Sequence, residues 1–256
     1  MQSETPEVVV QDVMDPARAD ALLAALGRAP LDGDVLPPFF HHLYFWEPQP
    51  PSGLGRDGHP KVGGVIPDLG LPRRMWAGGR LAFEAPLRVG LPAERRTFVD
   101  TTAHKQGRSG QLGFVTLRHE IWQGGTLCVT EHQDLVYREE VSGTRPVPPV
   151  APEGGAQREV RFDSTLLFRY SALTLNGHRI HYDETYARGV EGYDGLVVHG
   201  PLLAQLLMLE AGPLRTFAFR ATAPLMHSEP AVLCRDGASM WVRGPDGRLC
   251  MTAELG

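Results

Sequence analysis

The alternation of apolar and polar residues is most regular in the second half of the chain, where it predicts two helices and then a run of strands. Asp163-Ser164-Thr165 offers a candidate N-cap, and the segment 166–173 (LLFRYSAL) that follows it reads as a short amphipathic helix. A second segment, 201–211 (PLLAQLLMLEA), is apolar on nearly every side and begins with a proline, which predicts a buried helix. The strands predicted after it are LRTFAFRATAPLM, AVLCRD, SMWVRG and RLCMTAEL, with turns at 235–237 and 244–247.

The first half predicts one helix and a strand meander. Asp15-Pro16 begins a helix that runs through Leu26 and ends at Gly27. The aromatic segment 36–46 is expected to be buried, and 47–74 is dense in glycine and proline. A loop this long inside a compact domain is usually functional or mobile. The predicted strands are 80–89, RRTFVDTTAHKQ, GFVTLRHEIWQ and TLCVTEHQDLVYRE, with a hairpin turn at Gly124-Gly125.

A linker separates the two halves. Residues 142–157 (SGTRPVPPVAPEGGAQ) are rich in proline and glycine and nearly free of bulky apolar side chains, which favours an extended segment. The length of 256 residues suits one large domain or two small ones. We therefore expect a first domain over 1–141 and a second over 158–256.

Composition excludes several classes of protein. A net charge of −5 gives no general attraction to nucleic acid or to an anionic membrane. The amino terminus lacks the basic and apolar segments of a signal peptide, and no apolar run reaches the length of a transmembrane helix. We therefore expect a cytoplasmic protein. The cysteines Cys128, Cys234 and Cys250 lie far apart in apolar runs, which indicates core residues, not zinc ligands or disulfides.

The polar loop 176–200, NGHRIHYDETYARGVEGYDGLVVHG, lies between the two predicted helices. A loop held between buried helices can position catalytic groups rigidly. It resembles the active-site signature of the MaoC-like, or type 2, hydratases and hydroxyacyl-thioester dehydratases, Asp-x-Asn-Pro-Leu/Ile-His-x-Asp-Pro followed later by a His-Gly pair. His181 falls on the catalytic histidine and His199-Gly200 on the His-Gly pair. Asn176 stands in place of the catalytic aspartate, and Arg179 replaces the proline.

This resemblance implies an α+β double hot-dog fold, in which two antiparallel sheets each wrap a central helix and the N-terminal half is degenerate. The segment NGHRIHYD is most similar to the corresponding segment of a subgroup that includes mesaconyl-C4-CoA and itaconyl-CoA hydratases and fatty-acid-synthase-type dehydratase domains. It implies a hydro-lyase that reversibly hydrates a short enoyl-CoA thioester. Formation of citramalyl-CoA from mesaconyl-C4-CoA or itaconyl-CoA is the specific candidate. CoA is then part of the substrate, and no separate cofactor is expected.

Hydration of an enoyl thioester needs a base for water, stabilisation of the enolate oxygen and an acid for Cα. We expect His181 to perform both proton transfers, because an imidazole with a pKa of about 6.5 exchanges protons near neutral pH. Asn176 cannot take a proton and is expected to hold the water. The family implies that the thioester oxygen meets a backbone N–H at the start of the central helix, so Gly200, with Leu202 as a second donor, is the candidate.

The expected substrate-binding residues are Arg179, His199, Trp76, Arg80 and Arg108. The arginines could bind a carboxylate or the CoA phosphates, although each alone is equally well explained as an ordinary solvated charge. His199 is expected to orient the loop. An acyl pocket is expected between the halves, lined by Trp76 and the aromatic residues of 39–46, because the first half offers apolar side chains without its own acid or base.

No metal site is expected, because His41, His42, His119 and His132 show no metal-like spacing with nearby carboxylates. Two other functions stay open: a 3-hydroxyacyl-carrier-protein dehydratase of fatty-acid or polyketide synthesis, and a non-catalytic acyl-CoA-binding protein, which the missing aspartate would fit. A basic patch beside the pocket entrance would favour a carrier protein, and an arginine inside the pocket would favour a diacid substrate. The sequence leaves open whether the chain forms a homodimer.

Overall fold

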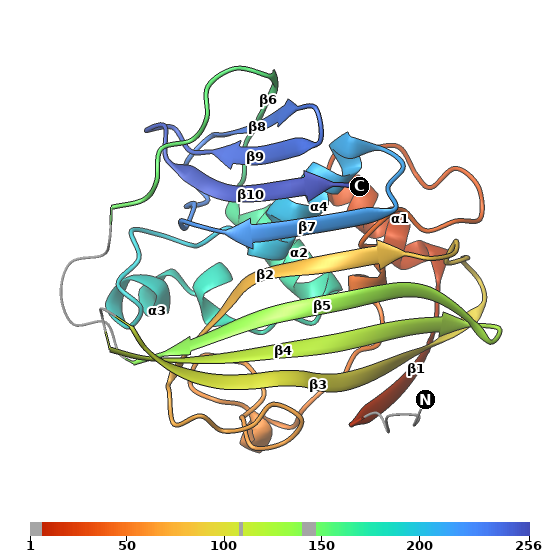
Figure 1. Cartoon of the computed structure of the whole chain (residues 1–256), viewed down its shortest axis with the longest axis horizontal. Helices are drawn as coiled ribbons and strands as arrows, with labels where there is room; N and C mark the ends of the chain where they lie inside the picture. Colours follow the sequence, from red (N-terminus) through yellow and green to blue (C-terminus); the bar gives the residue numbers. More distant parts are fainter. Residues whose placement is uncertain (1–6, 108–109, 140–146) are drawn as a thin grey trace.

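The ten strands of the computed structural model, which describes residues 7–107, 110–139 and 147–256, form one antiparallel sheet (Figure 1). Its strand order is β1-β3-β4-β5-β2-β7-β10-β9-β8-β6. The strands of the first half are β1 (Val8–Val13), β2 (Arg73–Phe83), β3 (Pro92–Gly107), β4 (Gly110–Gln123) and β5 (Thr126–Arg138). Those of the second half are β6 (Ala156–Val160), β7 (Thr216–Ala221), β8 (Ala231–Asp236), β9 (Ser239–Arg243) and β10 (Leu249–Leu255).

The helices pack on one face of this sheet (Figure 1). They are α1 (Pro16–Ala25), α2 (Ser164–Leu173), α3 (Glu184–Gly189) and α4 (Gly200–Ala211), with short 3-10 turns η1 (Phe40–Leu43), η2 (Pro51–Gly53) and η3 (Arg179–His181). Helix α4 is buried from Pro201 through Met208, and it contacts β2, β7, β9 and β10. One hydrophobic core includes side chains of both halves, among them Phe40 and Leu207. None of the described helices is long and apolar enough to span a membrane.

The two halves join where β2 pairs with β7, from Gly78 opposite Arg220 to Ala82 opposite Thr216. A Cβ atom on Gly78 would lie 2.4 Å from the carbonyl oxygen of Phe219, which is closer than van der Waals contact permits. The glycine pair in the segment MWAGGR therefore has a structural reason: only glycine lets the two strands approach at this point.

Aspartates cap three of the described helices, as the sequence predicts for Asp15 and Asp163. Asp15 accepts a hydrogen bond from Ala17 N (2.9 Å), Asp163 from Leu166 N (2.7 Å) and Asp183 from Tyr186 N (2.9 Å). Each satisfies a first-turn N–H that would otherwise have no partner. The hairpin turn at Gly124-Gly125 is also confirmed, and Cys128, Cys234 and Cys250 are buried and free.

Both bounds of the predicted strand 80–89 are wrong, because β2 begins at Arg73 and ends at Phe83. The glycines at 78 and 79 break the alternation that would have identified its first half. Strand β6 was not predicted and overlaps the last two residues of the segment 142–157. Its sequence, AQREV, is exposed along nearly its whole length, so this edge strand has no alternating pattern to detect.

Candidate active site

The loop that follows α2 bends sharply before Asn176. Leu175 has a left-handed backbone (φ 49°), and Asn176 N donates to the carbonyl oxygen of Ser171 (2.8 Å). The side-chain oxygen of Asn176 accepts from His178 N (3.0 Å), so the loop closes on itself in an Asx turn. Because that oxygen already accepts a hydrogen bond within the loop, the amide NH2 of Asn176 can donate hydrogen bonds to other groups.

His181 lies in η3, and a hydrogen bond from its Nδ1 to the backbone holds the ring in place. Its Nδ1 bonds the carbonyl oxygen of Val197 at 2.7 Å. A carbonyl can only accept, so Nδ1 carries the proton and Nε2 is the nitrogen that can act as a base. Burial lowers the pKa of His181 to about 3, and the ring is therefore neutral at physiological pH. The geometry thus presents a neutral imidazole with a fixed tautomer.

A second histidine fixes the plane of the first. The rings of His199 and His181 stack with centroids 3.6 Å apart and planes 20° apart. His199 is fully buried, its Nε2 bonds Ser171 Oγ (2.8 Å), and the ring of Tyr170 meets its edge. Burial holds the pKa of His199 well below its usual value. These contacts tie the end of α2 to the start of α4 through the catalytic loop, which agrees with an orienting role for His199.

The first half adds a histidine that sequence analysis missed. The ring of His59 lies 4.4 Å from that of His178, which in turn meets the ring of His181 at 5.4 Å. His59 Nδ1 bonds a carboxylate oxygen of Asp57 (3.1 Å). Burial, followed by the neighbouring His59 and His181, lowers the pKa of His178 to about 2. Burial would raise the pKa of Asp57, but the hydrogen bonds and charge of His59, together with His178, outweigh it and bring that pKa to about 2.

Close backbone contacts explain how the loop bearing His59 is held. A Cβ on Gly58 would lie 2.0 Å from the carbonyl oxygen of Gly177, and Arg179 N donates to the carbonyl oxygen of Asp57 (2.8 Å). Gly58 also has a positive φ (88°), which favours glycine. The length and glycine content of the segment 47–74 were the only sequence signals for this contribution.

Gly200 opens α4, as expected for an oxyanion donor. Its N–H and that of Leu202 belong to the first helical turn and have no acceptor within the helix, while Pro201 has no N–H. The carbonyl oxygen of Trp76 lies 3.9 Å from where a Cβ on Gly200 would be. The start of α4 therefore faces the strand of the other half that carries Trp76.

The predicted substrate-binding residues lie in different places. Arg179 bonds Asp183 (2.7 Å) and stacks over Tyr186 (4.3 Å), so its guanidinium braces the loop. Arg80 is exposed and forms an ion pair with Asp134. Trp76 donates from Nε1 to the carbonyl oxygen of Gly78 and stacks on His42 with centroids 5.2 Å apart. Arg108 lies outside the described residues.

A cavity of about 540 Å³ lies between the halves. The lining includes Tyr44, Phe45, Trp46, His59, Arg74 and Trp76 from the first half and Tyr170, Leu175, Asn176 and Pro201 from the second. The predicted wall of Trp76 and aromatic residues is present at this cavity, while the binding of an acyl group there stays a prediction. Of the expected site residues, Asn176 and Trp76 line the cavity. The described lining does not include His181, His199, Gly200, Arg179 or Arg80, and His181 is buried, with 6% of its surface exposed.

Backbone strain gathers around this cavity. Three non-glycine residues of the described ranges have positive φ: Phe39 (72°), Phe45 (61°) and Leu175 (49°). Phe45 and Leu175 line the cavity, and the ring of Phe39 packs on His42 at 3.9 Å. Such conformations cost free energy and cluster at functional sites, which supports the cavity as the site of activity.

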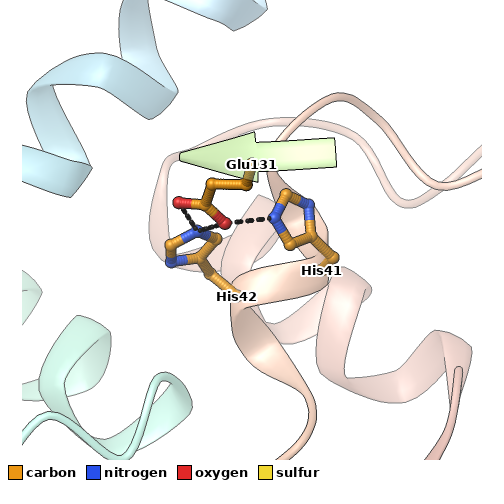
Figure 2. Close-up of side chains that lie close together, drawn as sticks. All are labelled: His41, His42 and Glu131. Atoms are coloured by element: carbon orange, nitrogen blue, oxygen red, sulfur yellow. Dashed lines mark hydrogen bonds and ion pairs between the residues drawn. The ribbon is translucent and has the colours of Figure 1, made fainter. Parts of the chain in front are cut away.

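The first half also contributes a titratable cluster to the cavity wall (Figure 2). His41 Nε2 and His42 Nε2, both on η1, each lie 2.9 Å from the same Oε2 of Glu131 on β5. Burial opposes ionisation of Glu131, but the two histidines hold its pKa well below the usual range. The expectations that no carboxylate lies near these histidines and that the first half lacks an acid or base are therefore wrong. The residues are about 90 positions apart in the chain, so no local pattern brings them together.

The donor atoms of His41, His42 and Glu131 lie within 4.8 Å of one another, and so do those of Asp57, His59 and His178. Such spacings could accommodate a divalent cation. In the structure, however, His41 and His42 pair directly with Glu131, and His59 pairs directly with Asp57.

A central buried helix with a fixed neutral histidine and free N–H groups at its start, beside an acyl-sized cavity, defines a hydratase or dehydratase of thioesters. Comparison with known proteins agrees. The sequence profile of hydroxyacyl-thioester dehydratase type 2 matches residues 39–227. The chain belongs to this family and is a hydro-lyase of hydroxyacyl thioesters.

Mesaconyl-C(4)-CoA hydratase of Chloroflexus aurantiacus is 46% identical over 266 aligned residues, covering 96% of this chain and 94% of the relative. Among solved structures, HtdX from Mycobacterium tuberculosis superposes with a TM-score of 0.72 at 16% identity, covering 97% of this chain and 98% of its own. Another M. tuberculosis protein, described as having a double hot-dog fold, covers 99% of this chain and 96% of its own with a TM-score of 0.58 at 14% identity. The predicted double hot-dog fold is confirmed.

Proposed function

We propose that this protein hydrates mesaconyl-C4-CoA to citramalyl-CoA and catalyses the reverse dehydration. The observation that carries the proposal is the 46% identity to a mesaconyl-C4-CoA hydratase over nearly the whole of both chains. The cavity supports it, since about 540 Å³ lies within the range that holds small ligands.

His181 is the base and the acid of the proposed mechanism. Its unprotonated Nε2 removes a proton from water as the water oxygen bonds to Cβ of the substrate. The electron pair of the double bond moves through Cα to the thioester oxygen and forms an enolate. The enolate then takes the same proton from Nε2 at Cα, so one water is added and His181 returns to its starting state. A single base on one side of the double bond predicts a syn addition.

Asn176 and the start of α4 supply the positions for these steps. Asn176 lines the cavity, and its amide NH2 is not used in the Asx turn, so it can hold the attacking water. The N–H of Gly200, with that of Leu202, is suited to the enolate oxygen because it lies at the positive end of the helix dipole. Our proposal for His199 is that it keeps the His181 ring in place through the stacked contact.

A carboxylated substrate is favoured over an acyl carrier protein by one observation. The guanidinium of Arg74 lines the cavity itself, where it can meet an anionic group of the acyl chain. A neutral acyl chain on a carrier protein gives no reason for a cation at this position.

The test is a spectrophotometric assay of the conjugated thioester absorbance over a panel of enoyl-CoA and enoyl-carrier-protein substrates. We expect mesaconyl-C4-CoA to lose its absorbance fastest, with citramalyl-CoA as the product by mass spectrometry. Turnover confined to carrier-protein substrates would replace the proposal with the dehydratase of acyl chain synthesis. Binding of acyl-CoA without turnover of any enoyl thioester would instead indicate a binding protein.

A further inference from the structure

The cavity is lined by three side chains that carry a permanent positive charge: Lys61, Arg74 and Arg95. Lys61 Nζ donates to the carbonyl oxygen of Ser52 (2.9 Å), and Arg95 forms an ion pair with Glu47. Arg74 has neither a hydrogen-bond acceptor nor an ion-pair partner for its side chain within the described ranges. A half-buried guanidinium without an acceptor is unfavourable, so this arrangement indicates a position where a ligand supplies the anion.

The acidic side chains at the same cavity cannot fill that role. Glu47 pairs with Arg95, and Glu131 is held between His41 and His42. Each of these carboxylates therefore already has a partner. An anion that enters the cavity meets the uncompensated charge of Arg74 in preference to the paired cation of Arg95.

The position of Arg74 places its charge at the catalytic end of the cavity. Arg74 and Trp76 lie two positions apart on β2 and both line the cavity. The guanidinium is close enough to His59 and His178 to lower the pKa of both rings, after the larger effect of burial. His178 in turn contacts the ring of His181. The positive charge and the catalytic histidine therefore act on the same part of a bound acyl group.

We propose that Arg74 binds the free carboxylate of the substrate and thereby selects carboxylated enoyl thioesters over neutral ones. This inference rests on the proposed function. Mesaconyl-C4-CoA bears its free carboxylate on Cβ, the carbon that water attacks. A guanidinium that holds this carboxylate near His178 would place Cβ beside the catalytic loop. Arginine suits this task because its planar group can form two parallel hydrogen bonds with a carboxylate.

The decisive measurement uses two saturated thioesters that cannot be hydrated. Methylsuccinyl-CoA, with the thioester at C4, carries the carboxylate on Cβ, and isovaleryl-CoA carries a methyl group in its place. Binding is measured by isothermal titration calorimetry for the wild type, Arg74→Met and Arg74→Lys. The matched control is Arg88→Met, since Arg88 is exposed, is paired with Asp34 and does not occur in the described lining of this cavity.

We expect Arg74→Met to weaken the binding of methylsuccinyl-CoA by about 30-fold or more, the usual consequence of removing one partner of a shielded charge pair. Isovaleryl-CoA should change by less than about threefold, because it makes only apolar contacts there. Arg74→Lys should retain part of the preference, and Arg88→Met should change neither affinity. Equal weakening of both ligands, or no weakening of either, would overturn the inference.

A rate measurement separates this inference from the proposed function. The same variants are assayed with mesaconyl-C4-CoA and with 3-methylcrotonyl-CoA, its neutral counterpart. If the wild type prefers methylsuccinyl-CoA in binding but hydrates no mesaconyl-C4-CoA, the proposed function fails and the carboxylate site stands. If it hydrates mesaconyl-C4-CoA and Arg74→Met reduces kcat/KM equally for both substrates, the proposed function stands and the carboxylate site fails.

Discussion

The imidazole rings of His181 and His199 are stacked 3.6 Å apart, with 20° between their planes. Both rings are buried and neutral, so they lie in contact without the repulsion that two imidazolium ions would have. His199 is anchored through Ser171 and His181 through the carbonyl of Val197. Nε2 of His181, the proposed catalytic nitrogen, thus has a fixed direction before the substrate arrives, which is the condition for efficient proton transfer.

His181→Ala should lower kcat by about 10² to 10⁴-fold or more while leaving the affinity for CoA thioesters nearly unchanged. The reason is that the imidazole acts mainly on the transition state. Steady-state kinetics on mesaconyl-C4-CoA, together with calorimetry on a saturated thioester, measures both effects. His104→Ala, at an exposed strand position, is the control and should keep full activity. An active His181→Ala enzyme would contradict the mechanism.

Asn176→Ala and Asn176→Asp separate two effects of this side chain. The alanine variant loses the group that holds water, and we expect a smaller loss in kcat than for His181→Ala. The aspartate variant places a second negative charge beside the carboxylate of mesaconyl-C4-CoA. Its kcat/KM should therefore fall more for mesaconyl-C4-CoA than for neutral 3-methylcrotonyl-CoA. If the aspartate variant instead favours mesaconyl-C4-CoA, the cavity does not receive the carboxylate near Asn176.

The free energy of unfolding should fall as the pH drops below about 6.5. His59, His178, His181 and His199 all have lowered pKa values in the folded protein, so below that pH the unfolded chain binds protons that the folded chain does not. Each such histidine contributes a slope of at most about 1.4 kcal/mol per pH unit. For His181 this window extends from about 6.5 down to about 3.

Urea unfolding at pH 8 and pH 5.5 measures this effect. The variant His178→Asn should show a shallower pH dependence than the wild type, because one of the buried histidines is removed. His104→Asn should keep the dependence of the wild type. Glu131 causes a second loss of stability at lower pH. Its pKa is depressed in the folded protein, and its stabilising charge disappears as the carboxylate is protonated. A wild type with equal stability at both pH values would contradict this prediction.

Gly78→Ala should destabilise the protein at the junction of the two halves. The added methyl group would meet the backbone oxygen of Phe219 at 2.4 Å, and a backbone atom cannot move aside as a flexible side chain does. Overpacking of this kind costs about 1–3 kcal/mol. Gly64→Ala is the control, because nothing lies within 4 Å of its added methyl group. The difference in urea midpoint between the two variants is the measurement, and equal midpoints would show that the junction can relax.

Local patterns predicted the helices and the catalytic loop well, because each depends on neighbours in the chain. The caps at Asp15 and Asp163 and the apolar run of α4 all act over a few residues. What the sequence did not predict depends on distant segments. Glu131 meets His41 only after β5 is paired into the sheet, and Asp57 and His59 reach the catalytic loop from more than a hundred residues away.

Arg74 shows the same limit in another way. In the sequence it adjoins Arg73, and nothing distinguishes the two. In the structure Arg73 is buried in an ion pair with Glu191, while Arg74 lines the cavity. The strand places successive side chains on opposite faces, so adjacent arginines acquire different surroundings. To place Arg74 at the cavity, one must know that β2 begins at Arg73. The sequence pattern placed the start of this strand seven residues too late.

The pairing of β2 with β7 has a consequence for how the cavity meets its ligand. The two halves share main-chain hydrogen bonds along this junction, so they cannot swing apart as hinged domains without breaking the sheet. The distance between the walls is therefore set before binding, and little of the binding free energy goes into assembling them. If the acyl group binds in this cavity, as we propose, its entry and exit depend on the lining side chains and on the segment 47–72, which carries His59. The rate of ligand exchange and the electrostatics of the catalytic loop are linked through this one segment of chain.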